Sequence, residues 1–231
     1  NDTYTALVAP QSVATGTAFI TCAFTNGKVF VYKMKEATDW QAGGEYTYTV
    51  SLAAAEDPGY TIEGDGSYTV TTDDGLRNVA KLVNEEGKTD IDITLTGDIT
   101  LTGEWTPIGT ESRPYTGNFD GGGHTITGLK IDQSGTDNVG LIGCLGSGGK
   151  VQNVTLTNIS VSGANCVGGI AGQNYGTVEN CSVNGTVTGK GFTDTGGIAG
   201  SNYGTISGCS AEGTVMGSVN VGGIAGGSYL G

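Results

Sequence analysis

One short phrase recurs four times in the last part of this 231-residue chain. It reads VGLIGCLG from Val139, VGGIAGQNYG from Val167, TGGIAGSNYG from Thr195 and VGGIAGGSY from Val221, so successive copies start 28, 28 and 26 residues apart. A fixed period of this size is typical of solenoids, in which each unit buries its apolar face only by stacking on its neighbours. The repeats therefore favour a scaffold over an enzyme.

The residues between the copies also align. VQNV, VENC and ISGC begin at Val151, Val178 and Ile206, and GTV occurs at both 185 and 213. The chain has 43 Gly but 4 Pro, which indicates tight turns between short strands rather than disorder. About three strands per unit predict an all-β, parallel right-handed β-helix, or β-solenoid, with apolar ladders inside. Four positions in the repeated phrase are expected to be buried: Val167, Ile170, Ile198 and Ile224.

A single amphipathic helix is expected at about residues 74–84, just before the repeats. Its apolar positions follow the helical spacing i, i+3, i+4 and i+7: Leu76, Val79, Ala80 and Val83. Asp73 or Asp74 can cap its start, and Asn84 and Gly87 can end it. We expect this helix to cap the first coil, which would otherwise expose a sheet edge.

Residues 1–63 predict a small antiparallel β domain, and residues 64–231 the solenoid. Three runs, 18–24, 28–34 and 45–52, are rich in β-branched and aromatic residues, and Asn26-Gly27 between the first two is a hairpin signal. Three or four strands make one sheet but not the second sheet of a sandwich. This domain is either the C-terminal part of a sandwich whose first half lies outside the chain, or a sheet docked on the solenoid.

The net charge of −13 is concentrated between residues 36 and 112, which hold 16 acidic and 3 basic residues. Without a basic patch, nucleic acid is an unsuitable partner. The acidic stretch predicts a solvated, self-repelling surface, with calcium binding as the alternative. No apolar run reaches the roughly 18 residues of a membrane span, so no span is expected.

The residues that usually carry catalysis are sparse. His124, the one histidine, sits in DGGGHTITG, which predicts a turn rather than a catalytic triad, and H-E-x-x-H is absent. Asp90, Asp92 and Asp98 alternate along one strand region and predict a solvent face rather than a glycosidase or lyase site. We expect no catalytic residue, no bound metal and no cofactor.

The five cysteines contain no C-x-x-C pair, which argues against zinc. Cys181 and Cys209 share one repeat position and would stack about 4.8 Å apart in a solenoid. That spacing does not exclude a disulfide, but small side chains in a Gly-rich core favour free, buried thiols.

Asparagine and tyrosine also recur with the repeat. The four N-x-S/T sequons predict turn asparagines rather than glycosylation sites: Asn153, Asn158, Asn180 and Asn184. Tyr175, Tyr203 and Tyr229, with Asn174 and Asn202 beside them, are the candidate binding residues. Stacked tyrosines on an outer face could hold sugar rings or a protein partner, and the alternative is that each tyrosine only covers a corner turn.

Two stretches resemble known families. The pattern GGIAGxNYGTIxxCSxxGTVxG at 168–189 and 196–217 resembles the GLUG repeat, and the lead-in segments WTPIGT, at 105–110, and GNFDGGGHTITGLKI are similar to those that open β-helices. LVAPQSVATGTAFITC, at 7–22, and DWQAGGEYTYTVSL, at 39–52, resemble the C-terminal part of a fimbrillin-like (Mfa-like) domain.

These resemblances imply a function without catalysis. GLUG repeats occur in bacterial surface proteins, including long adhesins and non-catalytic parts of immunoglobulin-A-cleaving peptidases, and fimbrillin-like domains belong to fimbrial subunits. We therefore expect a cell-surface or extracellular adhesin, or a fimbria-associated structural protein. Its expected partners are a host or bacterial surface protein or glycan, or other fimbrial subunits. The alternatives are a glycan-binding module and a β-helix polysaccharide lyase or hydrolase.

Overall fold

The computed structural model of the protein describes residues 11–23, 29–41 and 57–229. The chain forms two compact units, Asn1–Pro58 and Gly59–Gly231. In the first unit, two strand pairs are antiparallel: β1 (Gln11–Val13) with β4 (Thr38–Trp40), and β2 (Ala18–Ala23) with β3 (Val29–Lys33). The β2–β3 pairing confirms the two expected strands. The Asn26-Gly27 turn and the strand expected at 45–52 lie outside the described residues.

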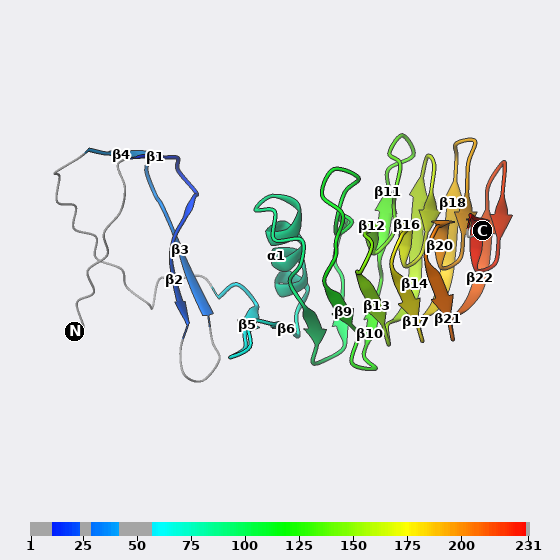
Figure 1. Ribbon diagram of the computed structural model, residues 1–231, viewed down its shortest axis with the longest axis horizontal. Helices are drawn as coiled ribbons and strands as arrows, with labels where there is room; N and C mark the ends of the chain where they lie inside the picture. The colour runs from blue at the N-terminus through cyan, green and yellow to red at the C-terminus, as the bar shows by residue number, and fades with distance from the viewer. Residues whose placement is uncertain (1–10, 24–28, 42–56, 230–231) are drawn as a thin grey trace. The chain divides into compact units, whose positions relative to one another are not determined.

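The second unit is a parallel β-solenoid, as expected, and Figure 1 shows its coils stacked side by side. One sheet contains β5 (Tyr60–Ile62), β6 (Tyr68–Val70), β7 (Ile93–Leu95), β9 (Asn118–Asp120), β13 (Lys150–Gln152), β17 (Thr177–Glu179) and β21 (Thr205–Ser207). A second sheet contains β8 (Ile99–Thr100), β10 (Thr125–Thr127), β14 (Thr155–Gly163), β18 (Ser182–Gly189) and β22 (Ser210–Met216), with β11 (Lys130–Asp132) also beside β14.

The repeated phrase forms the other two sheets. One contains β12 (Ile142–Leu145), β16 (Ala171–Asn174), β20 (Ala199–Asn202) and β24 (Ala225–Ser228), and the other β15 (Val167–Gly168), β19 (Thr195–Gly196) and β23 (Val221–Gly222). Each full unit therefore has four strands rather than about three, because the phrase bends between β15 and β16 and contributes two strands. The GGIAG segments stack in parallel, as expected.

The repeated phrase supplies the core of the coils. Val167, Ile170 and Ile198 are fully buried, as expected. Ile224 is 38% exposed, so the expectation of burial was wrong there. The reason is its position: β23 and β24 are the last strands of their sheets, and among the described residues no further coil covers them.

The expected helix is α1 (Asp73–Asn84), and its four predicted apolar positions are all buried. Its N-cap is Thr72 rather than Asp73 or Asp74, since Thr72 Oγ1 accepts a hydrogen bond from Gly75 N at 3.1 Å. The Asp73 carboxylate instead bonds Arg77 Nε and the Thr102 backbone. The Thr72 hydroxyl therefore gives a backbone N–H of the first helical turn its hydrogen-bond partner.

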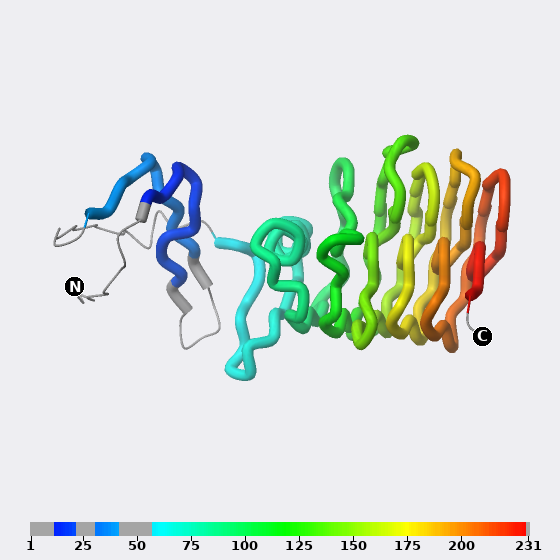
Figure 2. Tube along the Cα trace, turned by 45° about the horizontal axis from the view of Figure 1, so that its top comes forward, coloured from blue at the N-terminus to red at the C-terminus, as the bar shows by residue number. Residues whose placement is uncertain are grey.

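The helix and an antiparallel strand close one end of the solenoid. Asn84 Nδ2 donates to Pro107 O at 2.9 Å, and Asn84 Oδ1 accepts from Gly109 N at 2.8 Å, so the end of α1 is fixed to an early coil. β5 pairs antiparallel with β6 at the edge of its sheet. Figure 2 shows these elements beside the first coils. The parallel ladder of this sheet therefore ends at β6, and the antiparallel strand β5 covers its edge.

Left-handed asparagines mark two corners, as the sequons predicted for Asn153 and Asn180, whereas Asn158 and Asn184 lie inside β14 and β18, so the expectation of a turn was wrong there. Asn153 and Asn180 have φ of 53° and 51°, and Gly208 takes the same position in the next coil with φ 61°. Asn158, with φ 53°, lies in β14 where the register with β18 shifts, so it is an extra residue in that strand. Asparagine tolerates this conformation better than most residues, which explains why it recurs there.

Candidate binding surface

Three tyrosines form one column on the surface of the solenoid. They directly follow β16, β20 and β24, and the backbone ladder sets their positions. Tyr203 N donates to Asn174 O at 2.8 Å, and Tyr229 N donates to Asn202 O at 2.9 Å. The side chains of Tyr175, Tyr203 and Tyr229 are 43%, 38% and 50% exposed. The repeat therefore places one partly exposed phenol ring on each of three consecutive coils.

The rings stack on one another. The centroids of Tyr175 and Tyr203 are 4.7 Å apart with planes 8° from parallel, and those of Tyr203 and Tyr229 are 4.8 Å and 18°. Burial raises the pKa of Tyr175. Because neighbouring rings cover each other's faces, the column presents mainly ring edges to solvent. A sugar ring cannot stack on the covered faces while this arrangement persists.

Asn174 and Asn202 do not share this exposed surface. Asn174 is fully buried and Asn202 is 6% exposed. Asn174 Nδ2 donates to Asn202 Oδ1 at 2.7 Å, and its own Oδ1 accepts from Gly176 N at 3.1 Å. The expectation that these two asparagines bind a ligand is therefore corrected. Their amides are used inside the coil, where a buried polar group needs an internal partner.

A buried carboxylate behind the column was not anticipated from the sequence. Asp194 is 2% exposed and accepts hydrogen bonds from Ser201 Oγ at 2.5 Å, Asn220 Nδ2 at 2.8 Å and Tyr229 Oη at 2.8 Å. The bond to Asp194 raises the pKa of Tyr229. The sequence signal was an Asp at a repeat position where another copy has Asn220. Asp194 therefore anchors the third ring of the column from inside.

The single histidine lies on a different part of the solenoid. His124 Nδ1 is 3.4 Å from Asp98 Oδ1, and Asp98 also accepts from Thr125 N, which lowers the pKa of its carboxyl. Asp92 accepts from Asn118 N at 2.8 Å. These acids thus bond the backbone of a neighbouring coil. Within the described ranges, no three His, Cys, Asp or Glu side chains are grouped closely enough to hold a metal ion.

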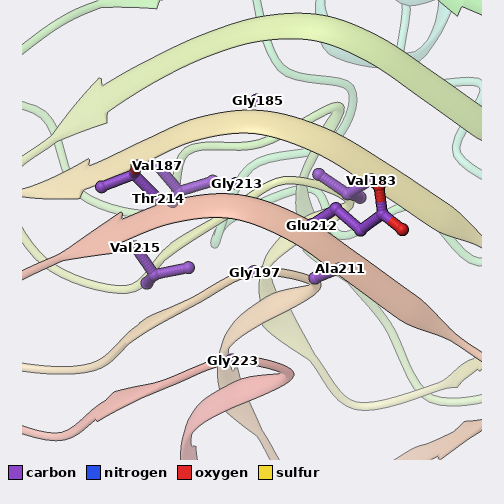
Figure 3. A pocket seen from close by; sticks show the side chains of 10 residues that line it. All are labelled: Val183, Gly185, Val187, Gly197, Ala211, Glu212, Gly213, Thr214, Val215 and Gly223. Carbon is purple, nitrogen blue, oxygen red and sulfur yellow. The ribbon is translucent and has the colours of Figure 1, made fainter.

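A small, partly open hollow lies at the last coil that the structure describes. It has a volume of about 70 Å³ and is lined mainly by glycines and by Val183, Val187, Ala211 and Val215 (Figure 3). Leu156, Val183 and Ala211 occupy the same position in successive coils, and their side chains become smaller in that order. The small side chain of Ala211 leaves this space unfilled. Small-molecule sites usually occupy about 300 Å³ or more. The hollow is therefore smaller than a typical small-molecule site.

The fold and this surface define a repeat scaffold, a parallel β-solenoid that displays a row of tyrosines. Comparison with known families agrees. Residues 1–74 match the fimbrillin-like family, and residues 163–188 and 193–216 match the GLUG motif. The chain is thus a GLUG-motif solenoid preceded by a fimbrillin-like segment, which confirms both resemblances. These matches and the solenoid fold fit a surface protein.

Halomucin from Haloquadratum walsbyi is 38% identical over 162 residues, which are 64% of this chain and 2% of halomucin. An Evansella cellulosilytica protein provisionally described as a Gly-rich membrane protein is 36% identical over 52% of this chain and 14% of its own length. The chain therefore spans a small part of the curated relatives it matches. The one helix among the described residues is too short and too polar to cross a membrane.

A solved structure shares the fold. The crystal structure of a Bacteroides ovatus protein provisionally assigned as an immunoglobulin A1 protease aligns with a TM-score of 0.52. The alignment covers 75% of this chain and 65% of that protein at 22% sequence identity. At this identity the likeness supports the β-solenoid architecture alone.

Proposed function

We propose that this chain is a non-catalytic, adhesive or fimbria-associated part of a bacterial cell-surface protein, and that the tyrosine column is its contact surface. The observation that carries the proposal is the continuous stack of Tyr175, Tyr203 and Tyr229, exposed along three coils. Tyrosine is enriched in protein interfaces, and rings held by a rigid ladder lose little conformational entropy on binding. Repeated rings can also add weak contacts through avidity.

A protein surface is the favoured partner. The covered ring faces leave ring edges as the main contact, which suits a flat partner more than individual sugar rings. A glycan is the second candidate, because the ring of Tyr175 at the first end of the column is not covered by a ring from the preceding coil. The residue in register with Tyr175 in the preceding coil is Gly146, which brings no side chain against that ring. One sugar ring at that end would bind weakly.

A combined glycan and matrix-protein array tests the proposal. We expect the triple variant Tyr175→Ala, Tyr203→Ala and Tyr229→Ala to lose binding, while a triple change to Phe keeps most of it. Phe192, which is 83% exposed on a loop, supplies the matched control, since Phe192→Ala removes an exposed ring outside the column. Unchanged binding by a folded triple-Ala variant would remove the tyrosines from consideration.

The absence of catalysis is a separate part of the proposal. Support comes from His124, whose Nδ1 lies 3.4 Å from the solvent-exposed Asp98 carboxylate rather than beside a nucleophile. A serine or cysteine nucleophile needs a base within hydrogen-bond reach. Incubation with a polysaccharide panel should therefore release no product. Turnover that disappears in His124→Ala would overturn the adhesin proposal.

A further inference from the structure

Cys181 and Cys209 are stacked on neighbouring coils of the solenoid. Each lies in the corner that connects one strand to the next, just before β18 and just before β22. Their flanking strands pair in parallel with a constant offset, which puts the two cysteines in register. Cys181 N donates to Cys209 Sγ at 3.4 Å. The structure therefore places two free cysteines next to each other on consecutive coils.

We propose that Cys181 and Cys209 are a modification site, at which exchange with a small-molecule disulfide joins two consecutive coils covalently. Neighbouring strands lie about 4.8 Å apart, within the roughly 4.4–6.8 Å that a disulfide requires between Cα atoms. Each thiol now points to the carbonyl oxygen two residues before it, Glu179 O and Ser207 O, both at 3.3 Å. Closing the bond needs a side-chain rotation that gives up one of these weak contacts.

The two thiols differ in a way that assigns their roles. Cys181 is 1% exposed, whereas Cys209 is half-buried and accessible from the last coil. The neighbouring Cys181 is the main cause that lowers the pKa of Cys209 to about 7. The neighbouring Cys209, first, and burial raise the pKa of Cys181. Cys209 is therefore the attacking thiolate, and Cys181 is the resolving thiol.

The exchange proceeds in two balanced steps. The Cys209 thiolate attacks one sulfur of the small disulfide, forms a mixed disulfide and releases one small thiolate. Cys181 then loses its proton to solvent and attacks Cys209 Sγ, which expels the second small thiolate. The protein pair is oxidised by two electrons, and the small disulfide is reduced to two thiols.

The test uses oxidised glutathione on the folded chain at pH 8, followed by denaturation, alkylation of remaining thiols and peptide mass spectrometry. We expect the Cys181 and Cys209 peptides to be joined, with the loss of two hydrogens, while Cys144 and Cys166 are alkylated. The joined protein should melt on the order of 5–10 °C higher, because the bond closes a loop between coils. A reducing agent should reverse the shift.

Two variants distinguish this pair from general thiol oxidation. Cys181→Ser should leave Cys209 as a stable mixed disulfide with glutathione, whereas Cys209→Ser should leave Cys181 unmodified, because it is buried. Both thiols alkylated after oxidation of the folded protein would overturn the proposal. So would a cross-link between Cys144 and Cys166 in place of this pair.

Discussion

The side-chain amide of Asn174 donates a hydrogen bond to Oδ1 of Asn202, one coil further along, with 2.7 Å between nitrogen and oxygen. Asn174 Nδ2 also lies 3.3 Å from Thr205 O, and Asn202 Nδ2 donates to Gly204 O at 3.2 Å. Each buried amide therefore bonds both along the solenoid and to a turn backbone. The same turns carry the tyrosine column, so the interior asparagines hold the exposed rings in place.

Replacing Asn174 by Ala should destabilise the solenoid by about 1–3 kcal/mol, because Gly176 N and Asn202 Oδ1 lose a buried partner. Urea unfolding measures this cost. The matched control is Asn184→Ala, since Asn184 is exposed and bonds only Glu212 among its recorded side-chain contacts. Equal midpoints for the two variants would contradict a structural role for the buried amide.

Gly169 lies where the backbone of one coil approaches the next. A Cβ there would be 2.6 Å from Gly197 O and 2.8 Å from Val183 Cγ1. Gly169→Val should therefore overpack the interior and cost about 1–3 kcal/mol. Thermal unfolding checks this, with Gly135→Val as control, because nothing lies within 4 Å of a Cβ at Gly135. A melting temperature that falls equally in both variants would show that close packing is not the cause.

Leu76 lies on the buried face of α1, the helix that closes one end of the solenoid, and is fully buried. Leu76→Asp should unseat this helix, since an unpaired buried carboxylate is strongly unfavourable. We expect aggregation in size-exclusion chromatography, because loss of the cap exposes a sheet edge. Lys81→Asp places the same side chain on the exposed face and should stay monomeric. A monomeric Leu76→Asp protein with an unchanged melt would disprove the capping role.

Tyr60 makes the capped end sensitive to alkaline pH. Burial, first, and the neighbouring Tyr68 raise the pKa of Tyr60 to about 12, against 10.0 ordinarily. The unfolded chain ionises first, so the stability contributed by neutral Tyr60 is complete below pH 10 and is lost as the pH rises towards 12. Each unit of pKa difference is worth about 1.4 kcal/mol. Tyr60→Phe should lose less stability between pH 9 and 11 in urea titrations, and an identical pH slope would reject this assignment.

The hollow beside Ala211 offers a stabilising substitution. Ala211→Val restores the side chain that Val183 has at the same ladder position and should raise the stability by about 0.5–2 kcal/mol. Differential scanning calorimetry measures the gain. A lower melting temperature would mean that the nearby Gly197 backbone leaves less room than the hollow suggests.

The solenoid could be predicted from the sequence because the residues that form its core recur with a fixed period. Ile170 and Ile198 recur with the unit, and stacking of one unit on the next places both inside. Ile224 has the same sequence context but lies in the last coil that the structure describes, and periodicity alone carries no information about its burial there. The helix cap was predicted incorrectly because three neighbouring residues can serve as the cap. Thr72, Asp73 and Asp74 can each cap a helix, but Asp73 bonds Arg77 within the helix and Thr102 in the first coil, and the cap is Thr72.

The candidate surface was predicted in part. A recurring Tyr next to a recurring Asn does not reveal which side chain points outward, because both lie at a bend between two strands. The backbone of β16 and β20 turns Asn174 and Asn202 inward and leaves the tyrosines outside. Asp194 was missed because a single acidic residue in a loop usually indicates solvent exposure. Its burial follows from three donors that converge from Ser201, Asn220 and Tyr229.

The constant register between units has an evolutionary consequence. A duplicated segment between β15 and β22 would carry its own ladder partners, its own corner asparagine and its own tyrosine. Recombination between the near-identical copies could therefore lengthen or shorten the array without redesign of the helix end. Each added unit would move the last ring about 4.8 Å further out. The number of units would then set the length of the tyrosine column.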